Sequence, residues 1–237
     1  GGEGIGKFQA QLADFTEPLA ETIKGFHNIR HRFVQWDEAL KRDAAGRKKE
    51  LSEEIGWIES RRGDMLGFWS KVEEGTIPTR VTHNDTKINN ILFDRQGEVL
   101  CAIDLDTVMA STSLNDFGDA IRSYANTGDE DDRDLSRVGL SLEMFRAYTE
   151  GYLSQRAKQL TDSEIDHLAF SPRYITFEQV LRFLMDYIDG DTYYKVKYPG
   201  HNLVRTLAQY RLLQSMEEHY GEMCRIVRET VDKYRKA

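Results

Sequence analysis

The chain lacks the features that would define several other classes of protein. With only two cysteines, Cys101 and Cys224, it cannot be a small scaffold built on many disulfides. No segment approaches the roughly 20 consecutive apolar residues of a membrane-spanning helix, and the first residues lack the basic-then-apolar order of a secretory signal. Lysine and arginine number 32 against 40 aspartate and glutamate, and the net charge of −8 does not favour nucleic-acid binding.

These absences together indicate a cytoplasmic protein with neither a nucleic-acid nor a membrane partner. Both cysteines are expected to be reduced in that compartment. Cys101 stands within an apolar run, which predicts a thiol buried in the core.

The remaining composition is that of a globular protein. The chain has 237 residues, of which 40% are hydrophobic and 30% charged, and this length is sufficient for a large core. Apolar residues recur at helical spacing over most of it. The pattern predicts helices within 1–15, 30–42, 44–75, 116–124, 140–153, 161–168, 171–185 and 201–234, the last as one long helix or two shorter ones.

One short stretch departs from this helical pattern. The runs 90–94 and 98–103 are β-prone and flank the polar turn Arg95-Gln-Gly97, as in a β-hairpin. Few other strands are indicated, so a doubly wound parallel sheet is not expected. The predicted fold class is α+β, mainly helical, with a small hairpin.

The hairpin brings chemistry-bearing residues together. Asp85 and Asn90 lie five residues apart in a polar loop before it, and Asp104 follows it. Because the hairpin reverses the chain, Asp104 returns to the neighbourhood of the first two. Phosphoryl transfer needs such a set: one carboxylate to orient the attacking hydroxyl and accept its proton, and an amide and a second carboxylate to hold Mg²⁺ on the phosphates.

The other polar residues of this stretch have two readings each. Lys87 either neutralises charge on the transferring phosphoryl group or pairs with Asp85. Asp106 either binds metal through water or holds the loop. His83 either acts in catalysis or braces the loop backbone.

The motif His83-Asn-Asp85-Thr-Lys87-Ile-Asn-Asn90 resembles the catalytic loop of protein kinases and their relatives. The wider run, with Ile103-Asp-Leu-Asp-Thr-Val-Met109 and Asn115-Asp-Phe-Gly-Asp119, resembles the aminoglycoside phosphotransferase and choline kinase superfamily. Within it the N-acetylhexosamine 1-kinases are most similar, over about residues 4–214. The resemblance implies ATP as co-substrate and Mg²⁺ at Asn90 and Asp104. Asp119, which enters the helix after this stretch, is expected to anchor the catalytic loop.

Kinases of this kind also have an N-terminal lobe, a small sheet with a phosphate-covering loop and a lysine that contacts the nucleotide. Residues 1–80 show helical patterns instead, and the glycines of Gly1–Gly6 do not follow a strand. We therefore expect residues 1–237 to be a single C-terminal lobe that carries the catalytic loop and acceptor site, with the nucleotide lobe missing from this chain.

An acceptor site is expected near the end of the 171–185 helix. The segment 186–194 is dense in carboxylates and aromatics, which bind the hydroxyls and the apolar face of a sugar. Its candidates are Arg182, Asp189, Asp191 and Tyr193, with Arg182 and Tyr193 placed first by resemblance to the sugar kinases.

Two further segments carry structural expectations. His27 and His31 are four residues apart but have no third ligand at metal-site spacing, which predicts a solvated or capping pair. Residues 107–114 read as a loop.

The sequence thus favours a small-molecule kinase that phosphorylates the anomeric hydroxyl of an N-acetylhexosamine. Kinases of other small alcohols, of the choline, homoserine or aminoglycoside type, remain open. So does a truncated, non-catalytic binding module, because the expected nucleotide lobe is missing.

Overall fold

A computed structural model describes residues 1–236. The fold is mainly helical, as the periodicity predicts. Its α-helices are α1 (Gly2–Gln11), α2 (Ile29–Arg42), α3 (Ser52–Glu73), α4 (Ser113–Tyr124), α5 (Leu142–Arg156), α6 (Asp162–Leu168), α7 (Ser171–Ile188), α8 (His201–Glu218) and α9 (Tyr220–Arg235). Short 3-10 turns occupy Lys48–Glu50, Ile88–Asn90, Leu105–Thr107 and Leu135–Arg137. None of the helices in the described part of the chain is both long and apolar enough to cross a membrane.

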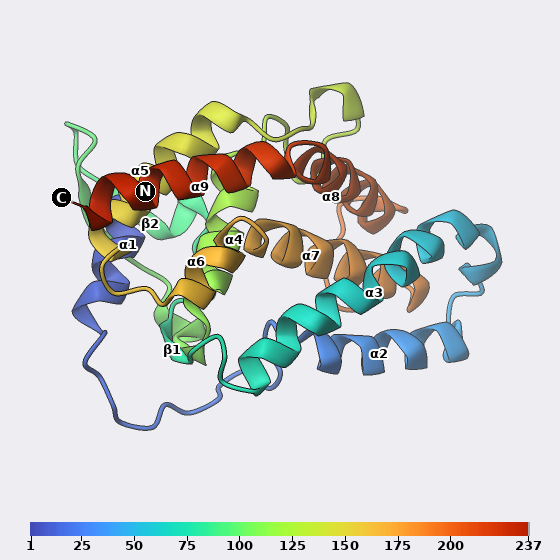
Figure 1. The fold of residues 1–237 in the computed structure, drawn as a ribbon. Helices are drawn as coiled ribbons and strands as arrows, with labels where there is room; N and C mark the ends of the chain where they lie inside the picture. Colours follow the sequence, from blue (N-terminus) through green and yellow to red (C-terminus); the bar gives the residue numbers. More distant parts are fainter. Residues whose placement is uncertain (237) are drawn as a thin grey trace.

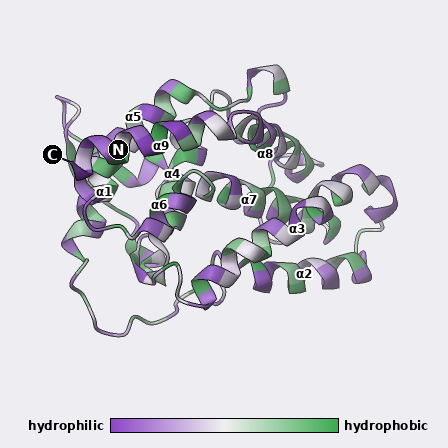
Figure 2. Ribbon diagram, viewed as in Figure 1, coloured by the Kyte–Doolittle hydropathy of each residue, from purple (hydrophilic) through white to green (hydrophobic). Residues whose placement is uncertain are grey.

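Helix α7 lies at the centre of the fold. It contacts α2, α3, α4, α6 and α8, which surround it (Figure 1). Its buried side chains include Tyr174, Phe177, Leu181 and Leu184, which join one hydrophobic core. Most of the surrounding helices mix hydrophobic and hydrophilic residues (Figure 2), so each turns an apolar side toward its neighbours.

The predicted hairpin is present as β2 (Ile91–Phe93) and β3 (Val99–Ala102), paired antiparallel. Its turn is held by Asp94, whose carboxylate accepts the backbone N–H groups of Gln96 and Glu98, each at 2.8 Å.

A second pair, β1 (Arg80–Thr82) with β4 (Met109–Ser111), was not anticipated. Strand β4 falls in the segment read as a loop, because three residues are too few to show a strand pattern. This pair brackets the polar stretch 83–108 and brings its two ends together.

The cysteine prediction is half right. Both cysteines are free, but Cys101 is exposed rather than buried. Strand β3 belongs to a two-stranded sheet, and such a sheet leaves one face of the hairpin open. An apolar run therefore does not by itself imply a core position here.

The N-terminal glycines serve helix packing. A Cβ atom on Gly2 would collide with the carbonyl oxygen of Tyr148 in α5, and one on Gly6 would lie 3.0 Å from that of Tyr152. Helices α1 and α5 can approach closely because these side chains are missing.

Gly118 allows a similar close approach between α4 and α7. A Cβ atom there would lie 2.5 Å from the carbonyl oxygen of Ser171, which is backbone and cannot move aside. We expect Gly118→Ala to destabilise the fold by about 1–3 kcal/mol, because overpacking outweighs the gain in helix propensity. Gly63→Ala in α3 is the matched control, because nothing lies within 4 Å of its Cβ position. It should stabilise by about 0.5–1 kcal/mol. Urea unfolding measures both, and equal midpoints would contradict the packing account.

Candidate active site

The backbone of the predicted catalytic loop is held by the carboxylate of Asp116. This residue lies in the first turn of α4 and is fully buried. Its two oxygens accept the backbone N–H groups of His83 at 3.0 Å and Asn84 at 2.7 Å, and Gln9 of α1 donates a third hydrogen bond at 2.8 Å. Asn84 has φ = 65°, a left-handed conformation that asparagine adopts more readily than most residues.

The expected anchor, Asp119, has another role. Its carboxylate pairs with Arg122 one turn further along α4, at 3.0 Å. The anchor prediction was therefore wrong by one helical turn. Asp116 and Asp119 both belong to the quoted motif, and residue type alone does not separate them. The distinguishing signal is position, since only Asp116 lies at the start of α4, beside the loop.

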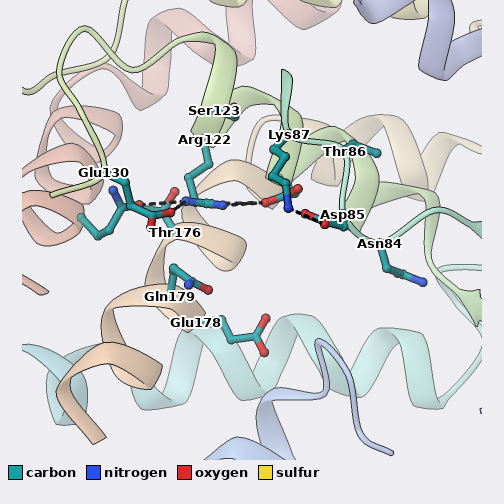
Figure 3. Close-up of polar contacts among 12 residues, drawn as sticks. Asn84, Asp85, Thr86, Lys87, Arg122, Ser123, Glu130, Thr176, Glu178 and Gln179 are labelled. Atoms are coloured by element: carbon teal, nitrogen blue, oxygen red, sulfur yellow. Dashed lines mark hydrogen bonds and ion pairs between the residues drawn. The ribbon is translucent and has the colours of Figure 1, made fainter. Parts of the chain in front are cut away.

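The side chain of Asp85 is held on one of its two oxygens. Lys87 Nζ lies 2.7 Å from Oδ2 (Figure 3). Asn90 Nδ2 donates to the same oxygen at 2.9 Å. Oδ1 has no hydrogen-bond partner within residues 1–236. The carboxylate is thus fixed in orientation, with one oxygen left open toward a ligand.

Lys87 therefore takes the ion-pair position that the sequence left open as one of two readings. Its partly exposed ammonium lies against Asp85, where it also reduces the charge that the site presents.

His83 braces the loop. It is buried, its Nε2 lies 2.9 Å from the carbonyl oxygen of Ile103, and its ring packs edge-on against Phe8 of α1. Thr107 donates to the His83 carbonyl oxygen at 2.6 Å. These contacts tie the loop to the segment after the hairpin, and they match the bracing role.

The structure brings Asn90 and Asp104 to neighbouring segments. The backbone N–H of Ile103 donates to the Asn90 carbonyl oxygen at 2.9 Å, which places Asp104 next to the loop. Asp104 is exposed and has φ = 63°. Asp106 is exposed too, and its carbonyl oxygen accepts a hydrogen bond from Thr22.

The donor chemistry of these residues fits Mg²⁺. Because Asn90 donates through Nδ2, its amide oxygen is turned away from Asp85 and remains available. Amide and carboxylate oxygens are the hard ligands that Mg²⁺ takes in small numbers beside phosphates. Across residues 1–236, no three His, Cys, Asp or Glu side chains lie close enough to hold a metal by themselves. Substrate phosphates would have to complete the coordination.

The acceptor-site candidates lie around a cavity of about 240 Å³ at the C-terminal half of α7. Arg182, Asp189 and Tyr193 line it, as do Arg32, Gln35, Met185, Asp186, Thr192 and Tyr194. The Arg182 guanidinium lies over the rings of Tyr193 and Tyr194, 5.9 and 5.4 Å from their centroids. Its hydrogen bond within residues 1–236 goes to the Gln179 amide oxygen, at 3.2 Å.

The carboxylates of this region are already engaged. Asp189 pairs with Arg42 at 2.6 Å, and Asp191, which is outside the cavity lining, pairs with Arg47 at 2.7 Å. Asp186, which the sequence reading missed, accepts the backbone N–H groups of residues 192–194 and fixes the tyrosine loop. Within residues 1–236, neither Arg182 nor Asp186 forms a salt bridge.

The cavity and the catalytic loop meet through α7. Glu178 of α7 binds both Arg32, which lines the cavity, and His27, whose ring lies 2.9 Å from the carbonyl oxygen of Asn84 in the catalytic loop. The two groups of predicted residues are therefore linked through buried side chains.

Removing the Asp116 carboxylate should destabilise the fold. We expect Asp116→Ala to lower the free energy of unfolding by about 2–4 kcal/mol, because two buried backbone N–H groups and Gln9 lose their acceptor. Asp129→Ala, which removes an exposed carboxylate, should stay within about 0.5 kcal/mol of wild type. Urea unfolding followed by circular dichroism gives both values. An Asp116→Ala protein as stable as the Asp129→Ala control would exclude the anchoring role.

Known proteins are similar to this chain in structure and in sequence. A choline kinase from Cryptosporidium parvum Iowa II is structurally similar with a TM-score of 0.44 and 13% sequence identity, covering 98% of this chain and 66% of that protein. The chain thus spans slightly less than two thirds of the length of this kinase. The profile described as the phosphotransferase enzyme family matches residues 2–153, more than half of the sequence and all of the catalytic loop. The chain belongs to the phosphotransferase enzyme family.

Proposed function

We propose that this protein, together with a nucleotide lobe, transfers the γ-phosphoryl group of ATP to a hydroxyl of an uncharged small molecule, the anomeric hydroxyl of an N-acetylhexosamine. The observation that carries the proposal is the state of the Asp85 carboxylate. One oxygen is held by Lys87 and Asn90, and the other is open. A group fixed in this way is suited to orient a hydroxyl and accept its proton.

Asp85, Lys87 and Asn90 have different roles in the proposed reaction. Asp85 Oδ1 accepts the hydrogen bond of the acceptor hydroxyl and takes its proton as the oxygen attacks phosphorus. Lys87 and the Asn90 amide hold the carboxylate still, which keeps the attacking oxygen in line. The Lys87 ammonium also offsets part of the negative charge in the site.

Mg²⁺ would be held by the Asn90 amide oxygen and Asp104, with Asp106 on the same exposed turn. When bound, it supplies charge neutralisation to the phosphates of ATP. The open positions of both side chains support this assignment.

The acceptor class follows from the polar groups of the cavity. Within residues 1–236, Arg182 forms no salt bridge, and Asp186 accepts hydrogen bonds only from backbone N–H groups and the Asn202 amide. The lining therefore carries one guanidinium and one carboxylate without ion-pair partners, a balanced set that suits a neutral sugar better than a polycation. A sugar hydroxyl or amide oxygen can accept from the guanidinium, and Tyr193, which is 74% exposed, offers a face for a pyranose.

The nucleotide side is apolar and uncovered. Leu92, Leu100 and Leu105 on and beside the hairpin are 43%, 64% and 54% exposed. Large apolar side chains exposed around one hairpin can be covered by a ligand or a neighbouring domain. The proposed occupants are the base of ATP and the expected nucleotide lobe.

The direct test is ADP release from MgATP with N-acetylhexosamines, choline, homoserine and aminoglycosides as acceptors. The assay compares this chain with a form joined to a nucleotide lobe. We expect turnover with the N-acetylhexosamines by the longer form and a loss of roughly 10²–10⁴-fold in kcat for Asp85→Asn, because the general base is removed. Asp129→Asn, an exposed match, should behave as wild type. Absence of turnover with every acceptor would favour the binding-module alternative.

The acceptor assignment has its own test. Arg182→Gln should raise the acceptor KM by roughly tenfold, the value of a hydrogen bond to a charged group, with little change in the KM for ATP. Arg228→Gln on α9, remote from the cavity, is the matched control. An unchanged acceptor KM, or turnover of choline in preference to sugars, would contradict the assignment.

A further inference from the structure

The peptide unit that joins Asn84 to Asp85 is hydrogen-bonded to a histidine ring at its carbonyl oxygen and to another at its N–H. His27 Nε2 lies 2.9 Å from the Asn84 carbonyl oxygen, and the Asp85 N–H donates to His83 Nδ1 at 3.3 Å. The two histidines come from different parts of the chain. His83 belongs to the catalytic loop, whereas His27 lies in the segment between α1 and α2.

The protonation of each ring follows from its partners. His83 accepts at Nδ1 and donates at Nε2 to the Ile103 carbonyl oxygen, so it is neutral. His27 faces a carboxylate at Nδ1, Glu178 Oε2 at 2.6 Å, and a carbonyl at Nε2. Both partners of His27 are acceptors, so both ring nitrogens must carry hydrogen. His27 is therefore an imidazolium.

The setting of His27 favours that charge. The residue is 4% exposed, so the sequence-based prediction of a solvated or capping position was wrong for it. Burial opposes the charge, but the carboxylate of Glu178 outweighs burial and holds the pKa of His27 above its usual value. Other charged groups nearby are Arg32 of α2, which donates to Glu178 Oε1 at 3.0 Å, Arg182 of α7 and Asp119 of α4.

The ring is also fixed in place through its own backbone. His27 has φ = 57°, and the Tyr174 hydroxyl of α7 donates to its carbonyl oxygen at 2.6 Å. The same hydroxyl accepts the N–H of Ile29 at the start of α2. Few rearrangements can therefore move the ring without breaking helix contacts.

We propose that His27 is a positioning residue for Asp85: as a doubly protonated ring it donates one N–H to Glu178 and the other to the Asn84 carbonyl oxygen, and so fixes the peptide from which the Asp85 side chain projects. Arg32, which lines the acceptor cavity, binds the same Glu178 carboxylate. A continuous polar chain thus runs from the cavity wall through Glu178 and His27 to the catalytic loop.

The protonation state can be tested without any activity. Long-range ¹H–¹⁵N NMR of the ring nitrogens in the full chain at pH 7.5 should show His27 with two protonated nitrogens. The signal should disappear in His27→Gln and persist in His31→Gln, a neighbouring histidine whose ring has no hydrogen bond within residues 1–236. In Glu178→Gln the amide can donate to Nδ1, so His27 should become neutral while it still donates to Asn84. A single ring N–H on wild-type His27 would overturn the proposal.

The positioning role needs a second readout. The backbone amide signal of Asp85 should shift in His27→Gln and not in His31→Gln. The kinetic test rests on the proposed phosphotransfer. His27→Gln should lower kcat roughly 10- to 100-fold and leave the acceptor KM within about twofold of wild type, because a displaced base slows the chemical step. An unmoved Asp85 signal, or wild-type kcat in a folded His27→Gln protein, would refute positioning.

The two proposals fail in different ways. A doubly protonated His27, together with an Asp85 amide signal that shifts in His27→Gln, supports the positioning role of His27 even when the wild-type protein turns over no acceptor. That lack of turnover would count against the kinase function alone. If His27→Gln does not fold, Glu178→Gln supplies the test. It should neutralise His27 and leave the Asp85 amide near its wild-type position, and a His27 that remains doubly protonated there would contradict the pairing.

Discussion

The site depends on the buried carboxylate of Asp116. Two consecutive backbone N–H groups, from His83 and Asn84, donate to it. An unpaired buried N–H is costly, so the loop has little freedom to adopt another course. The direction of the Asp85 side chain follows from this constraint.

The loop is then fixed from three directions that are remote in sequence. Helix α1 contributes Gln9 to Asp116, the segment after the hairpin contributes the Ile103 carbonyl to His83, and α7 reaches the Asn84 carbonyl through the ring of His27. Catalysis by proton acceptance needs a group held within a fraction of an ångström. Contacts from these separate segments hold the loop around Asp85, while the Asp85 side chain keeps one oxygen open.

The sequence predicted the elements that have strong local signals and missed those that depend on long-range partners. The helices, the hairpin around Gly97 and the polar loop follow from spacing and turn chemistry. The β1–β4 pair is too short to leave a pattern, and β3 exposes Cys101 because a two-stranded sheet has an open face. His27 was predicted to be solvated or capping because its partners, Asn84 and Glu178, are 57 and 151 residues away in the sequence. No local pattern reveals such contacts.

The central claim is that Asp85 delivers a sugar hydroxyl to the phosphorus of ATP. The most direct measurement is ³¹P NMR of the product that this chain, joined to a nucleotide lobe, forms from MgATP and an N-acetylhexosamine. The account predicts a phosphomonoester whose phosphorus couples to the anomeric proton, with no such signal from the Asp85→Asn protein. A phosphate on another hydroxyl would contradict the proposed site of phosphorylation. Unchanged ATP in the presence of every hydroxyl acceptor would contradict the phosphotransfer function itself.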